Sequence, residues 1–270
     1  PTPVILITLY RPTSHNAFTD AMAASLVSAL DLLSHDPRVK AIVVTGHGRI
    51  FCAGADLGAG LAYKQDTART HRDGGGTVTL AVHRCLKPVI AAVNGSAVGV
   101  GVTMTLPMNI RVVSEKAKIG FVFARRGSLW RLIGLSKAMH LITTGSVYPA
   151  THPLLRELFT EIVPEDEVLP RALELARDIA RNTSVVSTHL MKALMWRNPG
   201  TAEGTHLLDS KILLELFDGR DKLEGIQSFL QKRSPKFEGT MLENGPTAWP
   251  WWDPIDIKAP VSAADVKSKL

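Results

Sequence analysis

The sequence predicts an α/β protein that alternates strands with helices in its first half and is helical in its second half. Short runs of β-branched and apolar residues alternate with amphipathic segments up to about Phe123, a pattern typical of parallel βαβ units. From about Leu129 onward the apolar residues follow a helical period, and we expect no strand there. Apolar residues make up 45% of the 270 residues and charged residues 21%, the balance of a folded globular protein.

The predicted strands are apolar at successive positions, as expected where helices cover both faces of a sheet. We expect strands at residues 4–10, 39–45, 89–93 and 110–113, and a short apolar segment at 118–123. Turn sequences end the first three strands: Arg11-Pro12, Gly46-His47-Gly48 and Asn94-Gly95.

Helix signals separate and follow these strands. Thr19 or Asp20 caps a helix whose apolar stripe is Met22, Leu26, Leu30 and Leu33. A second helix is expected at 77–86, ending at Lys87-Pro88, and a helix of small residues at about 97–106. The helical second half gives further segments around Ala138, Leu141 and Ile142, and at 168–182, 185–195, 205–217 and 223–232.

Charge and cysteine content exclude several classes of protein. The formal net charge of +6 suits an anionic ligand such as a coenzyme phosphate, but no basic run carries the interleaved aromatic residues expected of a nucleic-acid binder. Cys52 and Cys85 provide no disulfide framework, which favours a reducing compartment. No apolar run reaches the ~18 residues of a membrane span.

The chain ends in Ser268-Lys269-Leu270, the tripeptide address that the peroxisomal import receptor reads. We therefore expect this receptor as a partner and the peroxisome as the location.

Two turns rich in small residues are the candidate sites. Phe51 to Leu57 reads as a strand end followed by a helix beginning near Asp56, and Asn94 to Thr103 repeats the arrangement. Small side chains there let a ligand approach backbone N–H groups, although each segment alone is also an ordinary tight turn. The second turn lacks the dinucleotide spacing, because Met104 stands where that motif needs Gly or Ala.

Other chemical signatures are weak. Phosphate-loop and Gly-x-Ser-x-Gly motifs are absent, and no metal site is expected because the spacing of His47, His71, His83 and His140 does not suit one. His71-Arg72-Asp73 before Gly74-Gly75-Gly76 reads as a flexible polar loop, with a lid over the ligand as the alternative. Trp249-Pro250-Trp251-Trp252 is an apolar patch expected to pack on the body or on another subunit.

Several motifs together carry a family resemblance. They are Arg11-Pro12 with Asn16-Ala17-Phe18; Phe51-Cys52-Ala53-Gly54-Ala55-Asp56-Leu57; Lys87 to Gly95 followed by Gly99 and Gly101; and Glu224-Gly225 with Phe229-Leu230, Lys232-Arg233 and Pro235-Lys236-Phe237. On these motifs, residues of about 4–237 resemble the crotonase (enoyl-CoA hydratase/isomerase) superfamily.

The resemblance implies a crotonase-like spiral of ββα and βαβ turns with a helical C-terminal trimerisation region. It implies an acyl-CoA thioester as substrate, no separate cofactor, and a homotrimer or hexamer. Ala55 and Val100 would supply the backbone N–H donors of an oxyanion hole. The implied substrate and CoA contacts are Ala53, Asp56, Leu57, Gly99, Thr103 and Phe123, with the CoA nucleotide near Arg11 to Asn16. We expect a core at 1–195, a helical region at 196–240 and a tail at 241–270.

The chain departs from the family at its acid/base positions. Hydratases of the family carry paired glutamates, and aligned on Asn94-Gly95 their positions hold Thr103 and Phe123, which cannot transfer a proton at neutral pH. An isomerase subgroup uses one glutamate in a later loop. The segment from Arg125 to Gly134 is shorter than the corresponding loop of that subgroup. Either the loop is truly short and its glutamate lost, or loop residues are missing from the sequence as read; we expect the second.

Within the superfamily, Leu141 to Phe237 is most similar to a fungal peroxisomal subgroup that includes mevalonyl-CoA hydratase of siderophore biosynthesis and relatives in toxin pathways. The segments that carry this are Thr143-Thr144-Gly145, Asn182 to Thr188, Leu194 to Arg197 and Ala202 to Ser210. Three functions follow: a hydro-lyase converting mevalonyl-CoA to anhydromevalonyl-CoA, a peroxisomal Δ3,Δ2-enoyl-CoA isomerase of fatty-acid β-oxidation, or a CoA-binding homologue without activity.

Overall fold

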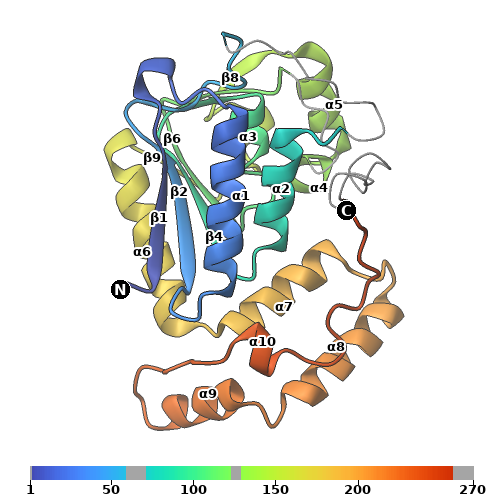
Figure 1. Ribbon diagram of the computed structural model, residues 1–270. Helices are drawn as coiled ribbons and strands as arrows, with labels where there is room; N and C mark the ends of the chain where they lie inside the picture. Colours follow the sequence, from blue (N-terminus) through green and yellow to red (C-terminus); the bar gives the residue numbers. More distant parts are fainter. Residues whose placement is uncertain (1, 59–70, 123–128, 258–270) are drawn as a thin grey trace, which may run out of the picture.

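The computed structural model describes residues 2–58, 71–122 and 129–257 (Figure 1). The larger sheet has the order β1-β2-β4-β6-β9, and every neighbouring pair is parallel. Its strands are β1 (Val4–Leu9), β2 (Ala41–Gly46), β4 (Val89–Val93), β6 (Ile110–Ser114) and β9 (Glu161–Val163). The expected parallel α/β fold is confirmed.

A second, smaller sheet has the order β3-β5-β7-β8. Its strands are β3 (Ile50–Cys52), β5 (Ser96–Val98), β7 (Lys118–Gly120) and β8 (Val147–Pro149). The first three are parallel, and β8 is antiparallel to β7. Along the chain, β2, β4 and β6 of the larger sheet are followed by β3, β5 and β7 of the smaller one. This repetition makes the backbone a spiral.

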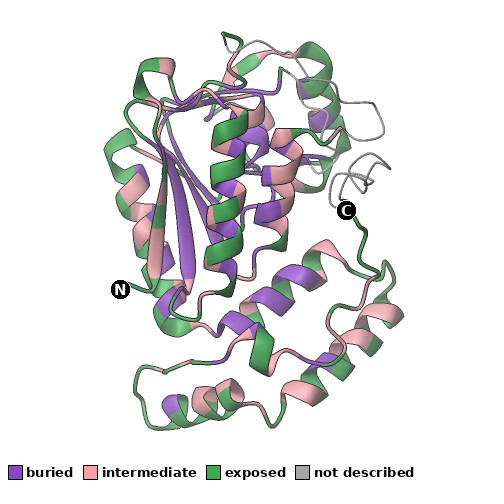
Figure 2. Ribbon diagram, viewed as in Figure 1, coloured by how far each residue is buried: buried purple, intermediate pink, exposed green. Residues whose placement is uncertain are grey.

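Alternating side chains explain why the strands are apolar on both faces. On β2, Ala41 and Val43 belong to a cluster with α6, whereas Ile42 and Val44 belong to the cluster that includes α1 and α2. Figure 2 shows β2 and β4 buried between these helices, which lie on either side of the sheet, whereas β1 at the sheet edge is only partly buried. Each face therefore has its own helical cover.

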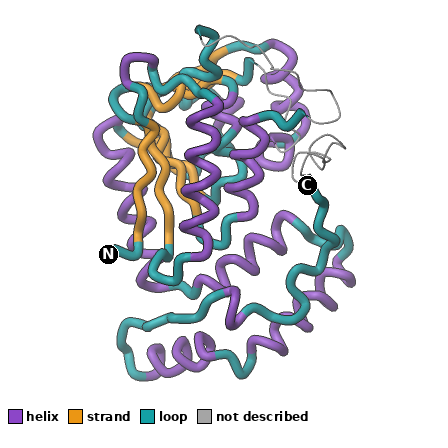
Figure 3. The backbone as a smooth tube through the Cα atoms, in the orientation of Figure 1, coloured by secondary structure: helices purple, strands orange, loops and turns teal. Residues whose placement is uncertain are grey.

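The helices of the spiral are α1 (Asp20–His35), α2 (Gly74–Arg84), α3 (Val100–Thr103), α4 (Leu129–Ile133), α5 (Leu135–Thr144) and α6 (Val168–Asn182). The last part contains α7 (Val185–Trp196), α8 (Ala202–Leu216), α9 (Arg220–Leu230) and α10 (Met241–Asn244). These helices form a layer at the amino-terminal end of β1, below the sheet in Figure 3. Within the described ranges, no helix combines the length and apolarity needed to cross a membrane.

Some predicted elements were wrong. The helix expected at 97–106 is reduced to α3, because Ser96–Val98 forms β5 beside β3 and the α-helix ends at Thr103. The second half does contain strands, since β8 and β9 extend the edges of the two sheets.

The polar loop before α2 is also assigned differently by the structure. The Asp73 side chain accepts a hydrogen bond from the Gly76 N–H at 2.7 Å, so it caps α2, and the three glycines form the first helical turn. The tryptophan patch packs on the body as expected, with Trp249 and Trp251 against the cluster of α7 and α8.

A buried arginine satisfies the carbonyl groups between α3 and β6. Arg111 is 7% exposed, and its guanidinium donates to the carbonyl oxygens of Leu158 (2.7 Å), Met108 (2.6 Å), Thr105 and Leu106 (both 3.3 Å). Burial lowers the pKa of Arg111 to about 10, so the group stays charged at neutral pH. It therefore fixes the irregular chain after α3.

We predict that Arg111→Met lowers the free energy of unfolding by about 3 kcal/mol or more, because several buried carbonyls lose their donor. Urea denaturation followed by circular dichroism measures it. Arg38→Met is the control, since the Arg38 side chain is 70% exposed and pairs with nearby Asp36 on the surface; it should change stability little. Equal midpoints for both variants would contradict the role given to Arg111.

Candidate functional site

The two candidate turns follow neighbouring strands. β3 and β5 pair in parallel, with Ile50 opposite Ser96 and Cys52 opposite Ala97. Because the carboxyl ends of parallel strands meet at one edge of a sheet, the turns at 53–57 and 99–100 lie side by side.

Glycine is required where these turns touch. A Cβ on Gly101 would stand 2.4 Å from the Cys52 carbonyl oxygen. Gly54 has a φ of +103°, and a Cβ there would stand 3.1 Å from the Val98 carbonyl oxygen. The close approach therefore depends on the absence of side chains at both positions.

The turn after β3 presents the Ala55 N–H. Phe18 donates its N–H to the Gly54 carbonyl at 2.8 Å and accepts from the Asp56 N–H at 2.9 Å, which makes a parallel bridge to Ala55. In such a bridge the middle residue turns its own N–H to the opposite side. The Ala55 N–H donates to no described residue, and Ala55 is exposed.

The turn after β5 presents the Val100 N–H. Gly99 is the N-cap of α3 with a φ of +56°, and its N–H donates to the Gly120 carbonyl of β7 at 2.8 Å. Val100 opens the helix, where N–H groups have no intrahelical acceptor. Its N–H has no acceptor among the residues described, and Val100 is half-buried. The site thus has a donor on each turn.

A buried asparagine holds the first turn in place. Asn16 is fully buried, has a φ of +54°, and donates through its side chain to the carbonyls of His47 (2.9 Å) and Ile50 (2.7 Å). Its side-chain oxygen accepts from the Arg11 N–H at 2.9 Å. Arg11 in turn forms an ion pair with Asp56 at 2.8 Å. The segment 11–18 is therefore fastened to the loop that carries Ala55.

The remaining predicted contacts divide into surface and buried groups. Ala53 is exposed, Leu57 is 71% exposed, and Asp56 is half-buried against Arg11. Gly99 and Thr103 are buried. The helix expected from Asp56 is not formed at 56–58, where Asp56 instead follows the Phe18 bridge. Phe123 and the terminal Ser268, Lys269 and Leu270 lie outside the described residues.

Position 103 carries no ionisable side chain. Thr103 is 3% exposed, and its backbone N–H donates to the Gly99 carbonyl at 3.0 Å. Residues 123–128 lie outside the described residues, so the expectation of additional loop residues between Arg125 and Leu129 stays a prediction.

Sequence reasoning found the two turns from their small residues but missed the anchoring role of Asn16. A signal existed, because an Asn in the turn between a strand and a helix tolerates a positive φ and can bond backbone groups. Within the described ranges, no group of three or more His, Cys, Asp or Glu side chains is placed to hold a metal ion.

Comparisons with known proteins agree with this architecture. Residues 1–240 match the family model described as enoyl-CoA hydratase/isomerase. The chain is 49% identical over 250 residues to "Enoyl-CoA hydratase AFT3-1" of Alternaria alternata, covering 89% of this chain and 84% of that one. It is 32% identical to the "2,3-dehydroadipyl-CoA hydratase" of Escherichia coli K12, over 87% of this chain and 95% of that protein.

Solved structures show the same relationship. A probable enoyl-CoA hydratase/isomerase from Mycobacterium abscessus superposes with a TM-score of 0.79 at 30% identity, covering 87% of this chain and 96% of that one. A putative enoyl-CoA hydratase from Streptomyces coelicolor A3(2) gives 0.78 at 32% identity, with coverages of 89% and 93%. The spiral fold, the paired glycine turns and these matches together place the chain in the enoyl-CoA hydratase/isomerase family, the crotonase superfamily.

Proposed function

We propose that the protein is an acyl-CoA hydro-lyase in which the N–H groups of Ala55 and Val100 form an oxyanion hole. The observation that carries this is the side-by-side placement of two backbone donors without acceptors among the described residues. Family membership makes the chain an enzyme of the hydratase/isomerase type.

The geometry suits chemistry next to a thioester carbonyl. Removal of a proton from the carbon beside the carbonyl puts negative charge on the thioester oxygen, and the two N–H groups would hold that oxygen. Loss of the β-hydroxyl with the removed proton then gives water and the enoyl thioester; the reverse is hydration. Preorganised donors of this kind contribute a few kcal/mol each to the transition state. Strands β3 and β5 fix both donors before substrate binds.

The proposed reaction needs no cofactor, because CoA is part of the substrate. Its nucleotide would lie along Arg11 to Asn16 and over Ala53 to Leu57, where exposed Ala53 and Leu57 leave the backbone accessible. The net charge of +6 favours a phosphate-bearing substrate.

Mevalonyl-CoA, dehydrated to anhydromevalonyl-CoA in siderophore biosynthesis, is the substrate that we propose. Similarity of Leu141 to Phe237 to the fungal subgroup supports it, and the half-buried Val98 and Val100 would give a small apolar lining for a short branched acyl group. The Alternaria relatives, named enoyl-CoA hydratases, are also fungal. The terminal Ser-Lys-Leu supports import into the peroxisome by its receptor.

A homotrimer or a hexamer is the assembly that we propose. Helices α8 and α9 expose large apolar side chains, among them Leu214 (74%), Phe217 (55%) and Phe229 (81%). Exposed apolar area of this extent is typical of an interface.

Two alternatives are kept. A Δ3,Δ2-enoyl-CoA isomerase would use the same oxyanion hole with a different proton relay. A CoA-binding homologue without activity is favoured by one observation, the presence of Thr103 where hydratases of the family carry a glutamate.

Ultraviolet assays separate these functions. We expect the conjugated enoyl absorbance of anhydromevalonyl-CoA to fall on hydration, and 3-hexenoyl-CoA to show no gain in absorbance. Turnover of 3-hexenoyl-CoA with silence on anhydromevalonyl-CoA would identify an isomerase. Binding of acyl-CoA in a calorimeter without turnover of either thioester would identify the silent homologue.

Ala55→Pro should lower kcat by about 10²–10³-fold, because proline removes the N–H donor. The change breaks no described hydrogen bond, since the Ala55 N–H has no acceptor there. Thermal melting and calorimetric CoA binding serve as controls for folding. Unchanged kcat in a folded variant would refute the oxyanion role of this residue.

The short segment after Arg126 is testable in the protein purified from its natural source. Trypsin should release Gly127-Ser128-Leu129-Trp130-Arg131 as one peptide, because cleavage follows Arg126 and Arg131. A longer glutamate-containing peptide ending in the same residues would show a longer loop than this chain has, and would supply the proton-transfer group.

A further inference from the structure

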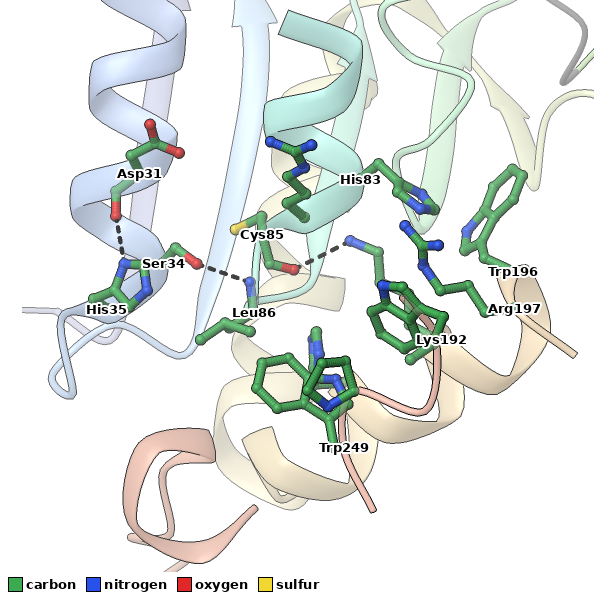
Figure 4. A pocket seen from close by; sticks show the side chains of 15 residues that line it. Asp31, Ser34, His35, His83, Cys85, Leu86, Lys192, Trp196, Arg197 and Trp249 are labelled. Atoms are coloured by element: carbon green, nitrogen blue, oxygen red, sulfur yellow. Dashed lines mark hydrogen bonds between the residues drawn. The ribbon is translucent and has the colours of Figure 1, made fainter. Parts of the chain in front are cut away.

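A cavity of about 350 Å³ lies away from the two glycine turns. It is bordered by the carboxyl ends of α1 and α2, by α7 and by the chain around Trp249, and it is partly open to the surface (Figure 4). The amino end of α2 is close to the candidate site, since a Cβ on Gly74 would stand 3.8 Å from the ring of Phe18. The cavity lies at the other end of this helix of 11 residues, about 16 Å away at 1.5 Å per residue.

A buried lysine supplies positive charge at this cavity. Lys192 of α7 is 9% exposed, and its ammonium donates to the carbonyls of Val82 (2.9 Å) and Cys85 (3.3 Å) at the end of α2. An ammonium has three donors, so one remains. None of the ion pairs of the described residues includes Lys192. Burial lowers its pKa to about 8, as expected of a cation without a nearby anion.

Two buried rings offer further polar atoms without partners. Both ring nitrogens of His189 and the indole nitrogen of Trp249 are buried, and none has a hydrogen-bond partner among the described residues. His189 is 6% exposed, and its ring packs edge-on against that of Trp249, with 5.4 Å between the two ring centres. Burial lowers the pKa of His189 to about 4, so at neutral pH one nitrogen donates and the other accepts. Such buried unpaired atoms are uncommon in folded proteins.

The remaining walls are largely apolar and cationic. Trp196 and Trp252 line the cavity, and the Arg197 guanidinium lies 4.2 Å from the centre of the Trp252 ring. Arg84 adds a second guanidinium, while Asp31 is the one acidic residue among the lining residues. A pocket of this volume that combines aromatic walls with charged side chains suits a small organic ligand.

We propose that this cavity binds a small organic carboxylate. Its carboxylate would accept hydrogen bonds from Lys192 and from the unpaired N–H groups of His189 and Trp249, and its apolar body would pack against the tryptophans. A bound anion would compensate the buried positive charge of Lys192. The aromatic walls favour an organic anion over inorganic phosphate. The proposal does not depend on the reaction assigned to the glycine turns.

The test is calorimetric titration of the full chain with hexanoate, hexanamide and inorganic phosphate. We expect hexanoate to bind, and the neutral amide of equal length and phosphate to bind at least tenfold more weakly. Equal affinity for hexanoate and hexanamide, or no heat with millimolar hexanoate, would overturn the proposal.

Two variants in the pocket and one control test whether hexanoate binds there. Lys192→Met should weaken hexanoate at least tenfold, whereas Lys211→Met, on the exposed side of α8, should not change it. Because Lys192 also caps α2, His189→Leu is the second variant: it keeps that cap and removes the unpaired nitrogens. It should raise the melting temperature and still weaken hexanoate tenfold. Hexanoate affinity unchanged in a folded His189→Leu protein would place the binding elsewhere and refute the cavity as its site.

Discussion

The contact between β3 and β5 is the constraint on which the site depends. Two short parallel strands bring their carboxyl ends together, and the backbones touch so closely that a Cβ on Gly101 would stand 2.4 Å from the Cys52 carbonyl. The Ala55 and Val100 N–H groups gain fixed positions from this contact. Their orientation then costs no rearrangement when a ligand oxygen arrives. Arg111 holds the irregular chain that follows α3, because its guanidinium donates to the carbonyls of that chain.

Much of the fold followed from patterns that local physics determines. The strands β1, β2 and β4 were predictable because apolar runs end in turn sequences, and α1 because Thr19 caps an apolar stripe. Strand β5 could not be predicted, and a helix was expected over 97–106 instead. The small residues of Ser96–Val98 give no clear strand signal, and the segment becomes a strand by pairing with β3. Likewise β8 and β9, of three residues each, depend on strands far away in the chain.

The candidate site shows the same division. Small residues at 53–55 and 99–101 predicted close backbone approach, and the motifs predicted the family. The hydrogen bonds of Asn16 to the carbonyls of His47 and Ile50 join positions more than thirty residues apart. No spacing in the sequence indicates such a contact. The buried Lys192 was likewise invisible, because a lysine on an amphipathic helix is usually solvated.

The tryptophan segment of the tail has an evolutionary consequence. Trp249 and Trp252 form walls of the cavity at the end of α2, and both lie beyond the residues that match the family model. Relatives that share the spiral but end in a different tail would lack those walls, whatever they hold at position 192. Sequence changes in this one terminal segment can therefore create or remove the pocket during evolution. Such changes leave the glycine turns of the candidate site unaltered.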